Sequence, residues 1–198
     1  MQNTADSARP AAARERLLAA AVTAFAAKGF HGTTTRDISV AAGMSPAALY
    51  VHYRSKEELL YQISREGHER TLAQLREAAA ASDDPVEQLT GMVRGFIVSH
   101  AQGHTGARIV NYDLAALAPE HLTEIQSIRR AIDEEVRAVL AAGVATGAFR
   151  TDNINLTATA LLSLGIDIAR WYRDDGAWQP DEIAEHYCAF ALRIVGAI

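Results

Sequence analysis

Side chains that can donate hydrogen bonds cluster between residues 34 and 56 of the chain. The cluster consists of Thr34, Thr35, Ser45, Tyr50, His52, Tyr53 and Lys56. Hydroxyl, imidazole and ammonium groups of this kind contact the phosphate and sugar oxygens of a nucleic acid and fix the register of a protein on a duplex. Ile38, Ala41 and Leu49 lie between them and can pack inward. We therefore expect a surface that contacts nucleic acid; the alternative is an ordinary helical corner, which does not require such donors.

Helix-stop and helix-start residues follow one another closely inside this cluster. Gly43 ends one short helix, and Ser45 followed by Pro46 begins the next, because serine is a favoured N-cap and proline fits the first helical position. Two short helices joined by a tight glycine-containing turn make a helix-turn-helix, whose second helix can lie in the major groove of DNA. The break thus predicts a short helix, ending near His52, whose outer face meets a duplex.

Capping pairs indicate where the neighbouring helices begin. Thr34 and Asp37 are spaced as a capping box at the start of the first short helix, with Asp in place of the usual Glu or Gln. Ser55 and Glu58 have the same spacing at the start of a long amphipathic helix. The helix that precedes all of these ends at Gly29. The segment therefore predicts three helices followed by the start of a fourth.

Composition is that of a folded protein. With 198 residues, of which 49% are hydrophobic and 22% charged, the chain can bury a real core, as one domain or as a small domain joined to a larger one. The single Cys188 permits no intrachain disulfide, which favours a reducing compartment. The start of the sequence lacks the apolar core of a signal peptide, and no run approaches the ~20 apolar residues that span a bilayer. We expect a soluble, cytoplasmic protein without a membrane partner.

The charge distribution favours the N-terminal part as the nucleic-acid surface. The formal net charge is −5, but residues 1–60 carry seven Lys/Arg and five Asp/Glu, a net +2, whereas residues 61–198 carry 12 and 19, a net −7. A relatively basic N-terminal part is typical of a protein that meets phosphates there. The alternative is a chance imbalance on a solvated surface, so charge alone decides little.

Catalytic and metal-binding motifs are missing from the sequence. It has no Gly-x-Ser-x-Gly elbow, P-loop, dinucleotide-binding glycine fingerprint or paired-cysteine motif. His100 and His104 share a face if one helix continues through Gly103, but no acid or cysteine nearby completes a metal site. We expect no catalytic residue, no metal and no cofactor, with an all-α enzyme built on scattered side chains as an alternative.

Two stretches of the N-terminal part, "LLAAAVTAFAAKGF" and "GTTTRDISVAAGMSPAALYVHYRSKEELL", together resemble the DNA-binding domain of TetR family transcriptional regulators. The resemblance implies a two-fold dimer that places two third helices in successive major grooves of an inverted-repeat operator. It also implies phosphate contacts around the second and third helices, with Ser45, Pro46 and Ala47 nearest the base edges. The DNA-binding residues that it implies are Thr34, Thr35, Arg36, Ser45, Pro46, Ala47, Tyr50, His52, Tyr53 and Lys56.

The remainder of the sequence predicts a second helical domain. Asp84 before Pro85 marks one helix start and Pro119 another, and the glycines of "GVATGAF" end the second of these helices. The last two helices, around "NLTATALLSLGIDIARWYR" and "PDEIAEHYCAFALRIVG", are apolar enough to need cover on more than one side. We infer that they pair with two copies from a second chain in a four-helix bundle. The alternative is that they complete the core of a monomer.

A ligand cavity is a further feature expected of this domain. Apolar residues on its middle helices can line a cavity, although a similar set occurs in any packed helical core. The ligand-binding residues that we predict are Met92, Phe96, His100, Arg108, Tyr112, Leu161, Leu164, Ile168 and Trp171. Asp167 lies within an apolar run and needs a partner if it is buried. Arg170 can supply a local ion pair, and a contact with a ligand or a second chain is the alternative.

The end of the chain is similar to that of TetR regulators of lipid and steroid breakdown, several of which respond to acyl-CoA thioesters. The similarity covers "GIDIARWYRDDGAW" and "QPDEIAEHYCAFALRIVG". It implies an amphipathic anionic effector, with an acyl chain in an apolar tunnel and its phosphate-bearing part near Arg108, Arg129 or Arg170. The alternative for each arginine is a solvated helix face.

These observations predict an all-α protein of about nine helices. We expect a flexible arm over residues 1–11 and a three-helix helix-turn-helix domain over 12–60, with the fourth helix continuing to about residue 80 as a connector. A helical ligand-binding and dimerisation domain is expected over residues 81–198. The predicted function is a homodimeric, ligand-released repressor that binds palindromic double-stranded DNA and a small-molecule effector. A helical adaptor that uses the same head for protein contacts is the alternative.

Overall fold

All the regular structure is helical in residues 3–197, the part of the chain that this computed structural model describes. The helices are α1 (Asn3–Gly32), α2 (Thr35–Ala41), α3 (Pro46–His52), α4 (Lys56–Ala80), α5 (Pro85–Gln102), α6 (His104–Tyr112), the 3-10 helix η1 (Leu114–Ala116), α7 (Pro119–Thr146), α8 (Ile154–Trp171) and α9 (Pro180–Ile194). The predicted all-α fold of about nine helices is confirmed. Since α1 begins at Asn3, it includes most of the segment 1–11, for which we predicted an arm; residues 1–2 lie outside the described residues.

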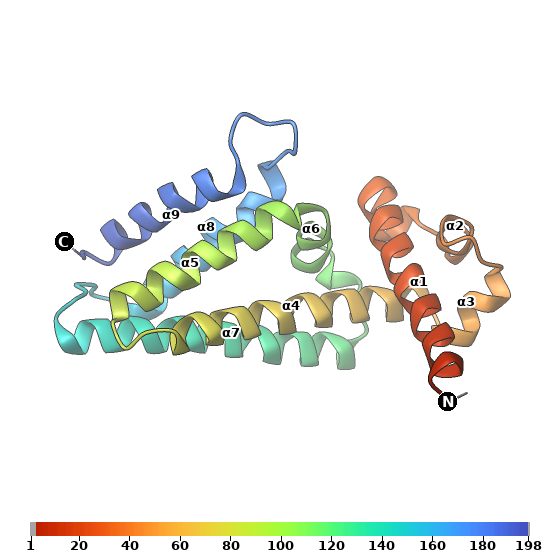
Figure 1. Ribbon diagram of the computed structural model, residues 1–198, viewed down its shortest axis with the longest axis horizontal. Helices are drawn as coiled ribbons and strands as arrows, with labels where there is room; N and C mark the ends of the chain where they lie inside the picture. Colours follow the sequence, from red (N-terminus) through yellow and green to blue (C-terminus); the bar gives the residue numbers. More distant parts are fainter. Residues whose placement is uncertain (1–2, 198) are drawn as a thin grey trace.

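The helices form a small head and a longer body (Figure 1). The head consists of α1, α2 and α3 at one end of the molecule, and α4 runs from the head along the body beside α7. In the body, α5 packs on α4 and α7, while α8 and α9 both pack on α5. Between α5 and the head lies α6, which contacts α1, α4 and α8. The head therefore meets the body along α4 and α6. None of the described helices is both long and apolar enough to cross a bilayer.

Local hydrogen bonds fix the starts of α2 and α3. Thr34 Oγ1 accepts a hydrogen bond from the Asp37 amide at 3.1 Å, and the Asp37 carboxylate accepts one from the Thr34 amide at 2.9 Å, so the predicted capping box is present. The hydrogen bonds from Thr34, together with an ion pair to Lys28 at 2.9 Å, hold the pKa of the Asp37 carboxyl well below its usual range. Ser45 Oγ accepts from the Ala48 amide at 3.2 Å and begins α3 as predicted.

The second predicted capping box forms only in part. Ser55 Oγ accepts a hydrogen bond from the Glu58 amide at 3.1 Å, as expected for the N-cap of α4. The Glu58 carboxylate, however, accepts from the Arg54 amide at 2.6 Å instead of the Ser55 amide. The side chain is long enough to reach one residue further back, where the extended chain offers an amide without a helical partner. Helix α4 still begins where the sequence predicts.

Glycines interrupt the helices at predicted and unpredicted positions. Gly29 (φ 72°, ψ 164°) departs from helical geometry inside α1, and Gly43 (φ 66°) lies in the turn between α2 and α3. Glycine enters this positive-φ region without steric cost. The break at Gly103 was not predicted: α5 ends before it and α6 begins after it. His100 and His104 therefore lie on different helices, so the condition under which they would share one helical face is not met.

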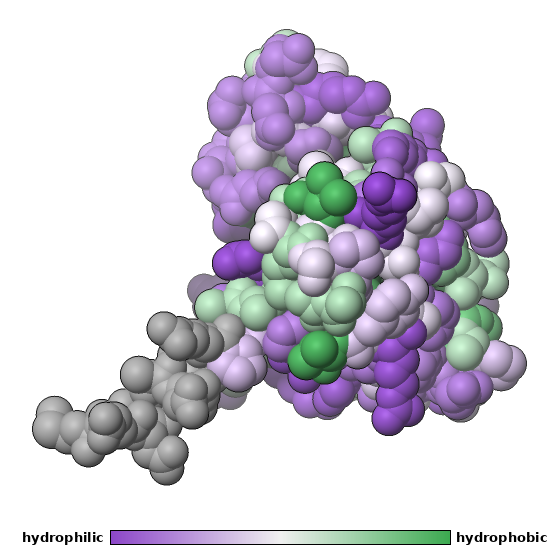
Figure 2. All heavy atoms as spheres, turned by 90° about the vertical axis from the view of Figure 1, so that its right-hand side faces the viewer, coloured by the Kyte–Doolittle hydropathy of each residue, from purple (hydrophilic) through white to green (hydrophobic). Residues whose placement is uncertain are grey.

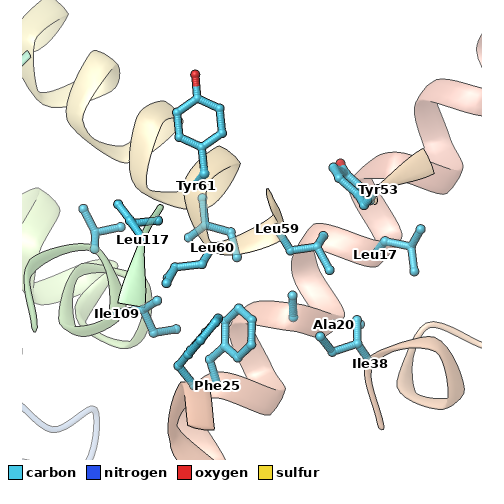
Figure 3. Packing of buried hydrophobic residues seen from close by; sticks show 14 of the residues in the cluster. Leu17, Ala20, Phe25, Ile38, Tyr53, Leu59, Leu60, Tyr61, Ile109 and Leu117 are labelled. Atoms are coloured by element: carbon cyan, nitrogen blue, oxygen red, sulfur yellow. The ribbon is translucent and has the colours of Figure 1, made fainter. Parts of the chain in front are cut away.

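One apolar core joins the head to the body. The side chains drawn in Figure 3 come from both parts and meet around Leu59 and Leu60 of α4, which are fully buried. Ile38 belongs to the head, whereas Ile109 of α6 and Leu117 belong to the body. Each fully buried side chain of this size stabilises the folded state by about 1.5–3 kcal/mol. The shared core therefore couples the position of the head to that of α4 and α6.

Candidate nucleic-acid interface and cavity

The outer face of α3 is open to solvent. Ser45, Pro46 and Ala47 at the start of the helix are exposed, and Tyr50 one turn later is 55% exposed. Leu49 points inward and is fully buried. A short helix with small residues at its exposed N-terminal turn can enter the wide major groove of B-form DNA without steric conflict. The exposure that a DNA-reading helix requires is therefore present.

Polar side chains lie on both helices of the helix-turn-helix. Thr34 and Arg36 are exposed at the start of α2, and Thr35 is half-buried beside them. The hydroxyls of Thr35 and Tyr50 share a hydrogen bond of 3.1 Å, which links the outer faces of α2 and α3. His52 is half-buried at the end of α3. Donors on two adjacent helices can contact several phosphates of one groove.

Tyr53 does not belong to this surface. Only 1% of the residue is exposed, and its hydroxyl donates a hydrogen bond to the Arg14 carbonyl oxygen at 3.4 Å. The Arg14 guanidinium lies 5.2 Å from the centroid of the Tyr53 ring, and burial raises the pKa of the Tyr53 hydroxyl. The predicted DNA contact of Tyr53 is therefore wrong, because the side chain anchors the end of α3 against α1.

Lys56 has partners within the protein. Its ammonium donates hydrogen bonds to the carbonyl oxygens of Phe30 and Thr33, at 2.8 and 2.9 Å, and lies 4.5 Å from the centroid of the Phe30 ring. These bonds satisfy two carbonyl groups at the end of α1. A lysine has three donors, so one is left for a phosphate. Loss of Lys56 would act on the fold of the head as well as on any DNA contact.

Two features of the head escaped the sequence analysis. Val40 on α2 and Val51 on α3 are 68% and 79% exposed. In Figure 2 the head face turned toward the viewer is hydrophilic around its margins and has a pale, weakly apolar centre with strongly apolar spots. The helical period could have revealed Val51, which lies two residues after the buried Leu49 and so on the other side of α3. The second feature is a hydrogen bond from Arg16 Nη2 to the Ala42 carbonyl oxygen at 3.0 Å, which holds the end of α2 on α1.

An open cavity of about 430 Å³ lies in the body next to the head. Its lining comes from α1, α4, α5, α6, α7 and α8 and is mostly apolar. Leu18, Ala19 and Val22 of α1 are part of the wall, so a bound molecule would touch a helix of the head directly. Small-molecule sites commonly have volumes of about 300–1,000 Å³. The cavity is therefore large enough for a small apolar ligand.

A polar cluster lies on the wall of this cavity. Arg129 Nη1 lies 3.1 Å from both His68 Nε2 and Asn111 Oδ1. His68 Nδ1 is 2.7 Å from the Ser64 carbonyl oxygen, which can only accept, so Nδ1 carries the proton and Nε2 accepts from Arg129. Burial lowers the pKa of His68 to about 4 and also lowers the pKa of Arg129. At neutral pH the cluster thus presents a charged guanidinium held by an uncharged imidazole and an uncharged amide.

Both parts of the chain match models of one protein family. The model "Bacterial regulatory proteins, tetR family" matches residues 17–63, and "Tetracyclin repressor-like, C-terminal domain" matches residues 82–195, more than half of the chain. The chain belongs to the TetR family. It is therefore a DNA-binding transcriptional regulator and not an enzyme, and the resemblance expected from the sequence is confirmed.

Whole-chain relatives support this assignment. The HTH-type transcriptional repressor KstR2 of Rhodococcus jostii (strain RHA1) is 31% identical over 94% of this chain and 93% of its own. A solved TetR family regulatory protein from Rhodococcus RHA1 is 40% identical, covers 94% of this chain and 98% of its own, and superposes with a TM-score of 0.90. The ketosteroid transcriptional regulator KstR2 of Mycobacterium tuberculosis is 27% identical, with coverage of 91% and 93% and a TM-score of 0.83.

Most of the ligand-binding residues predicted for this TetR family regulator lie outside the cavity of about 430 Å³. Phe96 and His100 line it, together with Arg129, which the sequence analysis had named as a candidate for an anionic group. Met92, Leu161 and Leu164 line, with Phe96, a separate pocket of only about 30 Å³, too small for an organic ligand. Met92 is 2% exposed and belongs to the core of the body. Helical periodicity shows which face of a helix is apolar but not where neighbouring faces leave space.

The other four predicted pocket residues lie nearer the surface or in a different core. Arg108 and Tyr112 line a second open cavity, of about 600 Å³, between α1 and α6, while Ile168 is fully buried and Trp171 packs against the same core cluster. His68 and Asn111, the polar residues that hold Arg129, were not predicted from the sequence. His68 lies on the same face of α4 as apolar residues such as Leu75, and a polar residue on an apolar face was a signal that could have revealed it.

Asp167 and Arg170 form the local ion pair that the sequence predicted. Arg170 Nε donates to Asp167 Oδ1 at 2.6 Å and Arg170 Nη2 donates to Asp167 Oδ2 at 2.9 Å. The hydrogen bonds from Arg170 lower the pKa of the Asp167 carboxyl. Both side chains are substantially exposed, so the pair contributes little to stability.

Large apolar side chains remain exposed along the last two helices of the regulator. Leu156 and Leu164 on α8 are 67% and 42% exposed, and Phe190 and Ile194 on α9 are 43% and 40% exposed. Trp178, in the loop between these helices, is 58% exposed. Large exposed apolar patches are unusual in monomeric soluble proteins and commonly mark interaction surfaces.

Proposed function

We propose that this TetR family regulator is a homodimeric repressor that leaves its operator when a small amphipathic molecule occupies the cavity. The observation that carries this proposal is the exposed outer face of α3, with Ser45, Pro46, Ala47 and Tyr50 open to solvent. The proposed domains are the head at residues 12–60, the connector α4 to about residue 80, and the body at residues 81–198. Action on chromosomal DNA places the protein in the cytoplasm.

In this proposal α3 lies in the major groove, and α2 contacts the sugar-phosphate backbone of the DNA. Ser45, Pro46 and Ala47 approach the base edges, because they are small and lie at the exposed start of the helix. Tyr50 and Thr35, joined by their hydrogen bond, contact phosphate oxygens. Thr34, Arg36, His52 and the third donor of Lys56 supply further contacts to the sugar-phosphate backbone or, for His52, a base.

Dimerisation uses the exposed apolar residues of α8 and α9. When these helices pair with their copies in a second chain, the apolar surface that becomes buried stabilises the dimer by about 25 cal/mol per Å². A two-fold dimer carries two copies of α3, which can bind two half-sites of an inverted repeat about one helical turn apart. The affinity of the dimer for both half-sites together greatly exceeds the affinity of a single head for one half-site.

The cavity can act on DNA binding because α1 forms part of its wall. A molecule that contacts Leu18 and Val22 favours a particular position of α1 and, through the shared core around Leu59, of the whole head. A coupling of ~1–3 kcal/mol changes operator affinity by about five- to 150-fold. A modest shift of the head is therefore sufficient to release the operator.

The relatives support repression and an apolar effector. One relative is named a transcriptional repressor and another a ketosteroid transcriptional regulator. The similarity of the C-terminal sequence to regulators that respond to acyl-CoA thioesters supports an effector with an apolar acyl or ring body. We propose such a molecule for this chain.

Genomic selection with the purified protein tests the proposal. Fragments of the source genome that the protein retains should contain an inverted repeat. The affinity of the protein for these fragments should fall steeply as the salt concentration rises. Ala47→Glu should abolish selection, because it places a carboxylate at the base edges, whereas Ala138→Glu on the exposed side of α7 should not. If the protein retains DNA without sequence preference, or retains no DNA, the result favours the alternative of a helical adaptor that uses the head for protein contacts.

Sedimentation tests the dimer separately. The protein should sediment at twice the mass of one chain, and Phe190→Glu should convert it to the monomer because the added charge cannot be buried in an apolar interface. Ala138→Glu adds the same charge on α7 and should leave the dimer intact. A wild-type monomer at micromolar concentration would refute the dimer.

A further inference from the structure

Arg129 is a half-buried cation on the cavity wall without an anionic partner. No carboxylate of the described residues lies within 4.0 Å of its guanidinium. The groups that contact its Nη1 are the neutral His68 ring and the Asn111 amide, which provide hydrogen bonds but no negative charge. Removing a charge from water is costly unless another charge compensates it. An anion supplied by a ligand would provide this compensation.

The neighbours of Arg129 hold the guanidinium and leave one of its edges available. His68 Nδ1 is fixed on the Ser64 carbonyl oxygen, and Asn111 Nδ2 donates to the Ala107 carbonyl oxygen at 2.9 Å, so both acceptors are held in place toward Arg129. Arg129 Nε and Nη2 have no protein acceptor among the described residues, and neither atom is fully buried. This edge of a guanidinium can bind two oxygens of one oxyanion in parallel.

The other charged residues of the cavity wall are solvated or already paired. Asp133 forms an ion pair with Arg137, while Glu66 and Arg70 are exposed. Much of the remaining wall is apolar and includes Leu18, Val22, Phe96, Leu162 and Ile166. The cavity therefore combines an apolar wall with one half-buried cation.

We propose that Arg129 binds the anionic group of the effector, which is an apolar molecule carrying one anionic oxygen group, a carboxylate or a phosphate. His68 and Asn111 act as positioning residues for the guanidinium. The proposal rests on the proposed function only where it calls the ligand an effector, because binding in the cavity does not require DNA.

Two fluorescent probes of similar shape and different charge test this proposal on the full-length protein. Anilinonaphthalene sulfonate is an apolar anion, and N-phenylnaphthylamine is its neutral parent. Arg129→Gln should weaken binding of the sulfonate about ten-fold, the scale of a lost charge-assisted hydrogen bond, and change binding of the neutral probe less than about two-fold. Arg130→Gln removes the same charge from the next, exposed position of α7 and should alter neither affinity.

Competition identifies the kind of anion. Octanoate, octyl phosphate and octanol are added to the bound sulfonate probe. A carboxylate site favours octanoate, a phosphate site favours octyl phosphate, and either anion should lose its advantage over octanol in Arg129→Gln. Octanol that competes as well as both anions in the wild-type protein overturns the proposal. Equal weakening of the charged and neutral probes by Arg129→Gln also overturns it.

Asn111→Asp provides a second variant if Arg129→Gln does not fold. It retains Arg129 and places a carboxylate where the Asn111 Oδ1 atom now lies, 3.1 Å from Nη1. The internal carboxylate should remove the preference for the sulfonate over the neutral probe, whereas an unchanged preference contradicts the assignment. These titrations contain no DNA. A failed operator selection with a positive titration therefore refutes the proposed function alone, and the reverse result refutes the role of Arg129 alone.

Discussion

The head and the cavity are built in different ways. In the head, the side chains proposed to contact DNA, apart from Lys56 at the start of α4, lie within residues 34–52, on the outside of two short helices whose starts are fixed by hydrogen bonds between residues close in sequence. In the cavity, the wall extends from Leu18 to Ile166 and uses six helices. A surface of the first kind can change its contacts without loss of the fold. A wall of the second kind is also the core, so its residues affect binding and stability together.

The largest effect is expected inside the head. Leu49 is fully buried under α3, and Leu49→Ala should lower the free energy of unfolding by about 2–5 kcal/mol. Operator affinity should fall with it, because the position of α3 depends on this contact. Val51 is 79% exposed on the same helix, and Val51→Ala should change stability by less than about 0.5 kcal/mol. Denaturant titration of both variants measures the difference, and equal losses would contradict the division between the two faces of α3.

A nearly equal effect is expected from acid, through the cavity wall. Burial lowers the pKa of His68 to about 4, from an ordinary value of 6.5. Between these values the unfolded chain takes up a proton that the folded chain does not, so stability falls as the pH decreases from 6.5 to about 4. The loss contributed by His68 can reach about 3 kcal/mol, since one pKa unit corresponds to about 1.4 kcal/mol.

Denaturant titrations at several pH values isolate this contribution. His68→Gln removes the titrating ring, so the variant should lose less stability than the wild-type protein between neutral and acidic pH. The pKa of His100 is also lowered by burial, and its share of the acid sensitivity should remain in the variant. If the free energy of unfolding decreases equally with pH in the two proteins, His68 is not the buried base that its environment indicates.

The contrast between the two regions also explains what could be predicted from the sequence. Caps, glycines and proline are local signals, and they predicted the limits of α2 and α3 and the start of α4. Tyr53 was assigned to the wrong side because its donor hydroxyl suggested a surface residue. The structure shows that the ring fills the space beside α1 and that the hydroxyl bonds to backbone there. Residue type alone does not determine on which side of a short helix a tyrosine lies.

The cavity wall could be predicted only in part because it depends on contacts far apart in sequence. Met92 and Ile168 have the apolar character of pocket residues, yet neighbouring helices fill the space around them. His68 and Arg129 meet only because α4 and α7 run side by side, which their own sequences do not show. The break at Gly103, which begins α6, also determines where the cavity lies and had no proline or strong cap to mark it.

A smaller effect is expected where α8 approaches α5. A Cβ atom at Gly165 would lie 2.4 Å from Cδ1 of Phe96, so Gly165→Ala should displace this ring, which also lines the cavity. Overpacking costs about 1–3 kcal/mol, offset by roughly 0.5–1 kcal/mol for removal of a mid-helix glycine. The expected net loss of stability is therefore between about 0 and about 2.5 kcal/mol.

Gly95 provides the matched control for this prediction. A Cβ atom there meets nothing within 4 Å, so Gly95→Ala should only gain helix propensity. Thermal unfolding and titration with N-phenylnaphthylamine should distinguish the two variants, because displacement of Phe96 changes the cavity and Gly95→Ala does not. Both should retain the operator affinity of the wild-type protein in the absence of a ligand. A stabilised Gly165→Ala variant would show that Phe96 has room to move.

The smallest effect is expected at the surface of the head, where one hydroxyl can be removed without disturbing the fold. Tyr50→Phe breaks the 3.1 Å hydrogen bond to Thr35, but Tyr50 is 55% exposed and water can replace that bond, so the free energy of unfolding should hardly change. Operator binding should weaken by about 0.5–1.5 kcal/mol, the net contribution of one hydrogen bond to binding. A double-mutant cycle shows whether the two hydroxyls act together. Thr35→Val removes the other hydroxyl, and the variant that carries both substitutions completes the cycle.

If the two hydroxyls hold one phosphate together, the double variant should bind the operator no worse than the more weakly binding single variant. Fully additive losses would mean separate contacts, and a loss of folding in either variant would mean that the outer face of α3 is not independent of the core beneath it.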